Sequence, residues 1–493
     1  KMKKRNKQSG AATSSILLMS VQIVTTILGL IITKLLSVNF SLKEYGTYSQ
    51  ALLVTTTVTS ISILGLTNAT NYFYNRTDDE VIQKKYISTI FSIQYIVGSI
   101  FAILIIVFRG EIALYFSNEK LKNILIIVAF TPVMTNLISM YQNLFVSIGQ
   151  AKKIAVRNFV VSILKLLAVI AACYAIKNIV TVLIVILFLD MAQVWYFASV
   201  FKKERYPIKK SNIEFGLVKE ILHFSIPMAI YVLTNSLTRD IDKYVISAFA
   251  DTETLAIYTN ASKILPFDML TASLITVLIP IITRLINQKK YGEAQNVFKL
   301  YLRIGYILTC VFVGGAIAVS EPLFLFLYDE KYISGLAVFV VYLFIDMIRF
   351  ANVTTILSGS GKTKILMSIS VIALAANAVF NIGMYKLMGI MGPALTTLII
   401  TIVMTVALTT FLGRQKENKN LTILWTIFIK RWIIGAEIVF LGALTHFLSI
   451  YLMGMKLSEF GVLMISYGTY LVIMFSLNFR RIIGCLRKLN TYK

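Results

Sequence analysis

Four charged residues lie within five positions of an otherwise apolar segment, namely Arg239, Asp240, Asp242 and Lys243. A helix turns by about 100° per residue, so the four side chains fall within an arc of about 160°. Arg239 and Asp242 are three positions apart, a spacing at which helix side chains pair, and Asp240 has the same spacing to Lys243. One interpretation is a self-neutralised polar face inside a helix bundle. We favour a face that lines a water-filled cavity and handles a charged substrate.

Other ionisable residues also lie inside apolar segments, where each costs at least about 2.5–3.5 kcal/mol to insert into a membrane. Asp346 and Arg349 repeat the three-residue spacing, whereas Glu437 stands alone in its segment. Lys165 and Asp190 lie near the middles of two consecutive segments. For them a structural ion pair and a functional contact are equally compatible with the sequence. The set also includes Lys263 and Asp268.

These residues divide into two predicted roles. Substrate contacts are predicted for Arg239, Asp240, Lys243, Lys263, Arg349 and Lys165. Coupling to H⁺ or Na⁺ is predicted for Asp242, Asp268 and Asp346, whose carboxylates could exchange a cation for substrate. In the second half of the chain the buried cations and anions balance. A substrate that itself carries both signs is therefore the alternative to cation coupling.

The chain that carries these charges has 493 residues, of which 57% are hydrophobic and 14% charged, and its mean hydropathy is +0.78. Soluble domains carry about 25% charged residues. Apolar segments of about 20 residues, enough to cross a hydrocarbon core of about 30 Å, recur along the chain. We therefore predict an all-α integral membrane protein with fourteen transmembrane helices, near 12–36, 45–74, 86–108, 122–148, 154–176, 179–201, 218–249, 254–286, 297–319, 332–358, 364–385, 389–412, 430–450 and 458–479.

The formal charge of +25 follows the membrane topology. With the N-terminus placed in the cytoplasm, most of the 48 Lys and Arg residues fall in cytoplasmic segments, as the positive-inside rule requires. This distribution places both termini in the cytoplasm and indicates attraction to anionic membrane lipids. We therefore expect no nucleic-acid partner.

Motifs that indicate enzymes are present only in part. Asp240 and Asp242 form a DxD sequence, but on a helix the two carboxylates point about 160° apart. The segment SGSGKT (358–363) ends like a phosphate-binding loop, yet Ile356 stands where that motif needs its first glycine. The two histidines lie far apart, and the three cysteines form no CxxC pair. We expect no enzyme activity, no metal site and no organic cofactor.

Three features recur at one spacing of 210 residues. They are Tyr48 and Tyr258 after an outside loop, Gly149 and Gly359 at the start of basic loops, and Glu111 and Glu321 at the start of outside segments. A shared offset predicts a duplicated six-helix unit, with an N-lobe at 1–210, a C-lobe at 211–420 and two additional helices within 421–493. Six crossings separate equivalent positions, so the halves are parallel repeats, as occur in secondary transporters.

Three segments carry a resemblance to a known family. FSIPMAIYVLTNSLTRDIDKYVISAFADTETLAIYTNASKI resembles the seventh and eighth helices of Wzx-type polysaccharide flippases of the multidrug/oligosaccharidyl-lipid/polysaccharide exporter superfamily. SGSGKTKILMSISVIALAANAVFNIGMYKLMGIMGPALTT is similar to the tenth to twelfth helices of that family, and LKEYGTYSQALLV to its first loop and second helix. The likeness extends over essentially the whole chain.

The resemblance implies a flippase in the bacterial cytoplasmic membrane that moves an undecaprenyl-(pyro)phosphate-linked oligosaccharide from the inner to the outer leaflet by alternating access. Its product would feed capsule, exopolysaccharide or teichoic-acid-type polymers. It also implies that helices 13 and 14 border a groove for the lipid tail, as in lipid II flippases. Family relatives hold the pyrophosphate in a cationic cavity, and the balanced charges here depart from that pattern.

The expected partners are the lipid-linked oligosaccharide and membrane lipids. We expect a monomer that works near glycosyltransferases and a polymerase or ligase. A cation-coupled small-molecule antiporter of the same superfamily is the first alternative. The second is a membrane polymerase or ligase, but such enzymes need large outside loops, and the longest outside loop predicted here has about a dozen residues.

Overall fold

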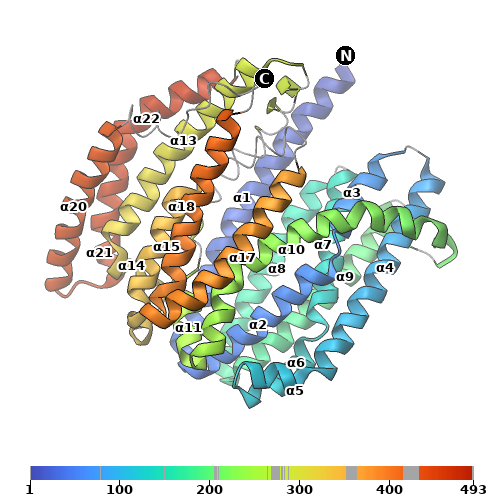
Figure 1. Cartoon of the computed structure of the whole chain (residues 1–493), viewed down its shortest axis with the longest axis horizontal. Helices are drawn as coiled ribbons and strands as arrows, with labels where there is room; N and C mark the ends of the chain where they lie inside the picture. The colour runs from blue at the N-terminus through green and yellow to red at the C-terminus, as the bar shows by residue number, and fades with distance from the viewer. Residues whose placement is uncertain are drawn as a thin grey trace. The chain divides into compact units, whose positions relative to one another are not determined.

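The computed structural model describes residues 2–77, 79–148, 150–204, 208, 210–263, 265–267, 278, 281–282, 284–286, 288–350, 363–414 and 432–490. The described residues form helices and contain no strand (Figure 1). Thirteen of these helices or helix pairs are long and apolar enough to cross a membrane. They correspond to thirteen of the fourteen predicted spans. The remaining span, near 254–286, is described only in part, because residues 264, 268–277, 279–280 and 283 lie outside the described residues.

The chain divides into two compact units, Lys1–Ala256 and Ile257–Lys493. The first contains α1 (Met2–Asn39), α2 (Leu42–Ser62), α3 (Leu66–Asn75), α4 (Glu80–Val107), α5 (Arg109–Tyr115), α6 (Glu119–Val128), α7 (Thr131–Ser147), α8 (Ala151–Ala171), α9 (Ile179–Glu204) and α10 (Val218–Phe249). The boundary falls within α11 (Thr252–Ala261). Compactness does not locate repeat boundaries, so the lobe limits after residues 210 and 420 stay predictions.

The second unit contains α13 (Tyr291–Ala318), α14 (Ser320–Leu327), α15 (Leu336–Arg349), α17 (Thr363–Met388), α18 (Met391–Arg414), α20 (Trp432–Gly454), α21 (Glu459–Val462) and α22 (Gly468–Asn490). Short 3₁₀ turns (Lys210–Asn212, Phe215–Leu217 and Glu330–Gly335) and π-helical turns (Ala172–Ile176 and Leu463–Tyr467) complete the described structure.

Several helix starts recur along the chain at nearly the spacing of the predicted duplication, which itself stays a prediction. α2 begins at Leu42 and α11 at Thr252, 210 residues later, while α5 begins at Arg109 and α14 at Ser320, 211 residues later. α4 and α13 are both 28 residues long. Turns and helix starts therefore recur within two residues of the offset inferred from three short sequence matches.

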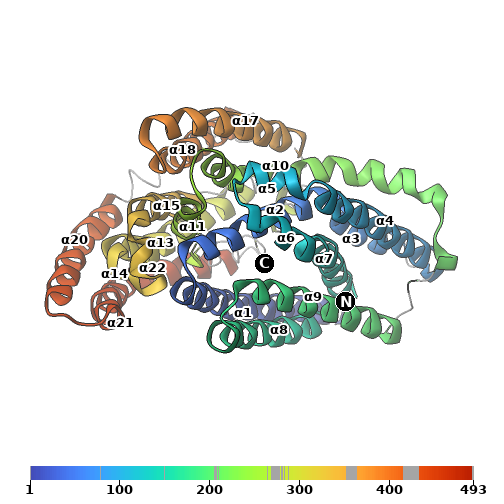
Figure 2. The ribbon, with the colours of Figure 1, turned by 90° about the horizontal axis from the view of Figure 1, so that it is seen from below.

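Within the first unit, α1 lies along α8, and α7 packs against α2, α3 and α9 (Figure 2). Gly65 separates α2 from α3 with a φ of 67°, a conformation that favours glycine. A Cβ at Gly65 would lie 2.4 Å from the carbonyl oxygen of Ser225 on α10. The glycine therefore allows α10 to pass directly over the break between α2 and α3.

At the start of α11, the Asp251 carboxylate accepts a hydrogen bond from the Thr254 backbone N–H over 2.7 Å. Hydrogen bonds from the side chain and the backbone of Thr254 hold the pKa of Asp251 below its usual value. The charged carboxylate therefore caps the N-terminus of α11.

Within the second unit, α13 forms the centre and contacts α15, α20 and α22. Gly314 and Gly315 allow the close approach of α22, because a Cβ at Gly315 would lie 2.5 Å from the Tyr470 ring. The Tyr470 hydroxyl donates to the carbonyl of Cys310 over 3.0 Å, and the Tyr467 hydroxyl donates to that of Phe312 over 2.8 Å. The two additional C-terminal helices are thus docked directly on the core of this unit.

Candidate functional site

The charged quartet predicted from the sequence lies on α10. Asp240 and Lys243 form the predicted ion pair, with Lys243 Nζ 2.6 Å from Asp240 Oδ1. Asp242 is 2% exposed and accepts a hydrogen bond from the Lys243 backbone N–H over 2.8 Å, whereas the Arg239 side chain is exposed. No ion pair joins Arg239 to Asp242 in the part of the chain that the structure describes. The quartet therefore contains one closed pair, one buried carboxylate and one exposed guanidinium.

Hydrogen bonds between α2 and α10 fix the position of α10. The Tyr244 hydroxyl donates to Thr57 Oγ1 over 2.6 Å, and the Ser60 hydroxyl donates to Ser236 Oγ over 2.7 Å. The Tyr115 hydroxyl donates to the Tyr244 carbonyl over 2.9 Å, and burial raises the pKa of Tyr115. The hydroxyls along α2 thus serve helix packing here, which positions the quartet.

The predicted pair on α15 is also formed. Arg349 Nη1 lies 3.1 Å from Asp346 Oδ1, and Asp346 is 3% exposed. Lys263 follows α11 and is half-buried. Asp268, the third predicted coupling residue, lies outside the described residues. The assignment of substrate and cation roles to these residues stays a prediction.

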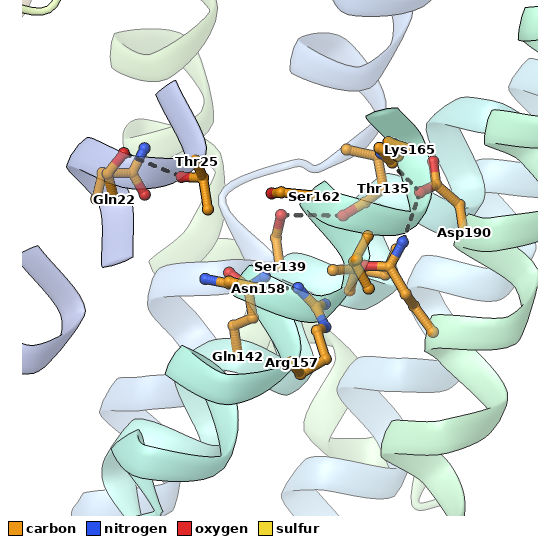
Figure 3. A pocket seen from close by; sticks show the side chains of 13 residues that line it. Gln22, Thr25, Thr135, Ser139, Gln142, Arg157, Asn158, Ser162, Lys165 and Asp190 are labelled. Atoms are coloured by element: carbon orange, nitrogen blue, oxygen red, sulfur yellow. Dashed lines mark hydrogen bonds and ion pairs between the residues drawn. The ribbon is translucent and has the colours of Figure 1, made fainter. Parts of the chain in front are cut away.

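A polar cavity of about 310 Å³ opens within the first unit, between α1, α7, α8 and α9 (Figure 3). Its lining residues are Gln22, Thr25, Thr135, Ile138, Ser139, Gln142, Arg157, Asn158, Val161, Ser162, Lys165, Asp190 and Gln193. Only Ile138 and Val161 among them are apolar. Among the described residues, Lys165 is the one predicted site residue that the lining includes.

Lys165 and Asp190 point toward each other in this cavity (Figure 3). Lys165 Nζ lies 3.3 Å from Asp190 Oδ1, and Gln193 Nε2 donates to the same oxygen over 2.8 Å. Asp190 is 5% exposed, while about a third of the Lys165 side chain remains exposed. The two residues therefore form an ion pair between α8 and α9 that is part of the cavity wall, and a contact of Lys165 with substrate stays a prediction.

Arg157 is the second cation of the cavity and was not among the predicted site residues. It is 9% exposed, and its guanidinium carbon lies 4.4 Å from the centre of the Phe197 ring, a cation–π distance. It donates to Asn158 Oδ1, and with the Gln142 amide oxygen turned toward it, to Gln142 over 3.0 and 3.3 Å. A buried guanidinium is thus held by an aromatic face and by neutral amide oxygens.

The cavity residues of α8 follow a spacing that the sequence contains. Asn158, Ser162 and Lys165 are separated by four and three positions, so they share one helix face. Arg157 lies one residue before this series, near the predicted start of the span at 154. Basic residues at that position are typical of the membrane boundary, so its place in the cavity was not predicted. Polar residues at helical spacing next to a midspan lysine were the signal that could have identified the cavity wall.

Glu437 has a partner, contrary to the expectation that it stands alone. Its carboxylate oxygens both lie 3.2 Å from Arg481 Nη1, and the Asn478 amide donates to it over 3.2 Å. The pair joins α20 to α22. Arg481 lies two residues beyond the predicted end of the last span, at 479. The structure continues α22 to Asn490, so this arginine is still on the helix that packs beside α20.

No group of three or more His, Cys, Asp or Glu side chains converges as a metal centre in the described ranges. The three cysteines, Cys173, Cys310 and Cys485, are free and buried. The chemistry that the described residues offer is therefore the binding of polar and charged groups through ammonium, guanidinium, amide and hydroxyl groups.

Comparisons with known proteins identify a family for this chain and solved structures with a similar fold. A family model described as polysaccharide biosynthesis protein matches residues 31–337. Among curated proteins, no sequence matches. The solved structure of the lipid II flippase MurJ, in an inward closed conformation, is similar with a TM-score of 0.75 at 16% identity, over 95% of this chain and 100% of that chain.

Transporters of the MATE family have a similar fold over less of the chain. An inward-facing multidrug resistance MATE transporter of the MOP superfamily has a TM-score of 0.69 at 12% identity, covering 82% of this chain and 98% of its own. A MOP superfamily transporter from Pyrococcus furiosus, described as having a binding pocket of reverse polarity, has a TM-score of 0.59 at 14% identity, covering 83% and 95%. At these identities the likeness concerns the fold.

Proposed function

Because the chain belongs to the polysaccharide biosynthesis protein family, whose model matches residues 31–337, we propose that it is a flippase for a lipid-linked oligosaccharide. The substrate is an oligosaccharide on undecaprenyl phosphate or pyrophosphate, moved from the inner to the outer leaflet of a bacterial cytoplasmic membrane. The carrying observation is a polar cavity with two cations and one carboxylate in its lining, inside an otherwise apolar helical protein. Lipid does not tolerate such a surface, whereas a sugar headgroup requires it.

An apolar groove in the second unit supports a lipid-linked substrate. It has a volume of about 360 Å³ and is lined by Val311, Phe312, Leu471, Val472, Phe475 and Ser476, from α13 and α22. The transfer of a hydrocarbon chain from water or polar surroundings to such a lining is favourable. The groove lies between α13 of the second unit and α22, one of the two helices predicted to follow the six-helix repeats, and it suits a polyprenyl tail.

Translocation proceeds by alternating access and uses a gradient of H⁺ or Na⁺. Asp242, Asp346 and Asp268 are the proposed coupling carboxylates. Arg239, Lys243, Lys263 and Arg349 are the proposed contacts for the phosphate groups, with Asp240 holding Lys243 in place. We further propose that both termini lie in the cytoplasm, that the protein works as a monomer, and that glycosyltransferases and a polymerase or ligase act before and after it in making a capsule, exopolysaccharide or teichoic-acid-type polymer.

A cation-coupled small-molecule antiporter is the second candidate. The fold likeness to MATE transporters favours it, as does a cavity whose volume lies at the lower end of the range of about 300–1,000 Å³ for small-molecule sites. The MATE structures leave nearly a fifth of this chain unmatched, whereas the lipid II flippase matches 95% of it. That difference in coverage is why the lipid-linked substrate is preferred.

The test is a leaflet assay in proteoliposomes. Purified full-length protein is reconstituted with a fluorescent undecaprenyl-pyrophosphate oligosaccharide, and the fraction reachable by an external glycosidase is followed with time. The proposal predicts that this fraction rises faster with protein than in protein-free vesicles and faster still under a cation gradient. Equal rates with and without protein, together with exchange of a cationic dye for protons, would instead establish the antiporter.

A further inference from the structure

Arg157 carries a buried positive charge, and among the described residues no carboxylate forms an ion pair with it. The described residues place no Asp or Glu oxygen within ion-pairing distance of it, and its Nε has no hydrogen-bond partner. Asn158 and Gln142 supply neutral oxygens only. Asp190, the one carboxylate in the cavity lining, is already bonded to Lys165 and Gln193. The cavity therefore has one positive charge in excess.

Burial of an uncompensated guanidinium costs free energy, because amide oxygens satisfy its N–H groups without neutralising its charge. The Phe197 ring beneath Arg157 recovers part of that cost and keeps the guanidinium plane in one orientation. A planar guanidinium presents its N–H groups as a fork that binds oxyanions in a two-pronged geometry. In Arg157 the Nε–H of this fork has no hydrogen-bond partner among the described residues. An oxyanion bound in the cavity would therefore supply the counter-charge for the Arg157 guanidinium.

The other lining residues indicate what kind of molecule would carry that oxyanion. Side-chain amides of Gln22, Gln142, Asn158 and Gln193 and the hydroxyls of Thr25, Ser139 and Ser162 surround the two cations. These groups both donate and accept hydrogen bonds, as the hydroxyls of a sugar do. Only two of the thirteen lining residues are apolar, so the cavity offers little surface for an aromatic or alkyl ligand.

We propose that this cavity is a subsite for an acidic saccharide and that Arg157 binds its oxyanion, either the carboxylate of an acidic sugar or a phosphate ester on the glycan. The proposal rests on the flippase function and specifies its substrate: the transported oligosaccharide is anionic in its sugar portion as well as in its lipid phosphate. Lys165 stays paired with Asp190 and positions the sugar beside Arg157.

Binding of soluble probes to the purified full-length protein tests the proposal. The probes are tri-galacturonate, glucose 1-phosphate and neutral maltotriose, with calorimetry as the readout. Arg157→Gln should weaken tri-galacturonate binding about 10- to 100-fold, the loss expected for a charged hydrogen bond. The matched control is Lys152→Gln, which removes an exposed cation from the same helix outside the cavity and should leave binding unchanged.

A second variant guards against misfolding of Arg157→Gln. Asn158→Asp places a carboxylate where the amide oxygen now accepts from Arg157, so it neutralises the guanidinium from within and should abolish tri-galacturonate binding while leaving the thermal unfolding midpoint unchanged or raised. Rescue of binding by Arg157→Lys to within a few-fold of wild type would support a charge requirement.

The probes separate the possible oxyanions. Binding of glucose 1-phosphate that is also lost in Arg157→Gln identifies a phosphate ester as a source, and insensitivity of this probe identifies the carboxylate. Equal binding of maltotriose and tri-galacturonate, or equal losses in Arg157→Gln and Lys152→Gln, would overturn the proposal. Because these measurements need no translocation, they can fail while the leaflet assay succeeds, and the reverse.

Discussion

Asp242 is the residue of the α10 quartet best placed to exchange a cation. It is the most buried of the four, at 2% exposure, and its Oδ1 accepts a hydrogen bond from the backbone N–H of Lys243. Asp240, by contrast, is held by Lys243 Nζ at 2.6 Å. Burial therefore distinguishes Asp242 from the other three residues of the quartet.

We predict that Asp242→Asn removes the dependence of transport on a cation gradient. Asparagine keeps the size and the hydrogen bond to Lys243 but cannot lose or gain a charge. Transport under an imposed Na⁺ or pH gradient should fall to the rate that wild type shows without one, while substrate binding persists. The rates are measured in the leaflet assay with each gradient applied separately. Full acceleration by either gradient in the variant would assign coupling to another residue.

At the scale of helices, Glu437 and Arg481 hold the two additional helices together. Their ion pair joins α20 to α22, and the side chains are 17% and 32% exposed. Loss of one partner leaves the other as an uncompensated charge in partly apolar surroundings, whereas loss of both does not. α22 also packs on α13 through Tyr470 and Gly315, and α13 and α22 line the apolar groove.

We predict non-additive effects in a double-mutant cycle of Glu437→Gln and Arg481→Gln. The coupling between them should be about 0.5–3 kcal/mol, measured from unfolding in mixed micelles. The same cycle on Glu119 and Lys122, an exposed pair with 3.4 Å between charged atoms, should give a coupling near zero. Additive effects at Glu437 and Arg481 would mean that this ion pair does not stabilise the helix contact.

Helix positions and pairs within one helix could be predicted from the sequence, and contacts between helices mostly could not. Lipid forces backbone hydrogen bonds into helices, so apolar length alone located the spans. Fixed helical geometry likewise predicted the pairs Asp240–Lys243 and Asp346–Arg349. The position of Arg157 over Phe197 depends on how α8 and α9 are rotated against each other. That rotation results from many small packing contacts, which spacing in one sequence does not reveal.

At the scale of the whole molecule, the duplication constrains the topology more strongly than any single span does. Helix starts recur at offsets of 210 to 212 residues, as for Ile179 of α9 and Met391 of α18. If each repeat contributes six crossings, equivalent positions must lie on the same side of the membrane. An odd number of crossings per repeat would place them on opposite sides, as in inverted repeats. The side of the membrane on which matched residues lie therefore shows whether each repeat has an even or an odd number of crossings.

Glu111 of α5 and Glu321 of α14 are matched, exposed positions for this measurement. We predict that Glu111→Cys and Glu321→Cys both react with a membrane-impermeant maleimide on intact spheroplasts. Lys203→Cys, at the exposed end of α9 that is predicted to face the cytoplasm, should react only after permeabilisation. The native cysteines are buried, so wild type provides a low background. If only one of the two glutamate positions reacted from outside, six crossings per repeat and a parallel relation of the halves would both be wrong.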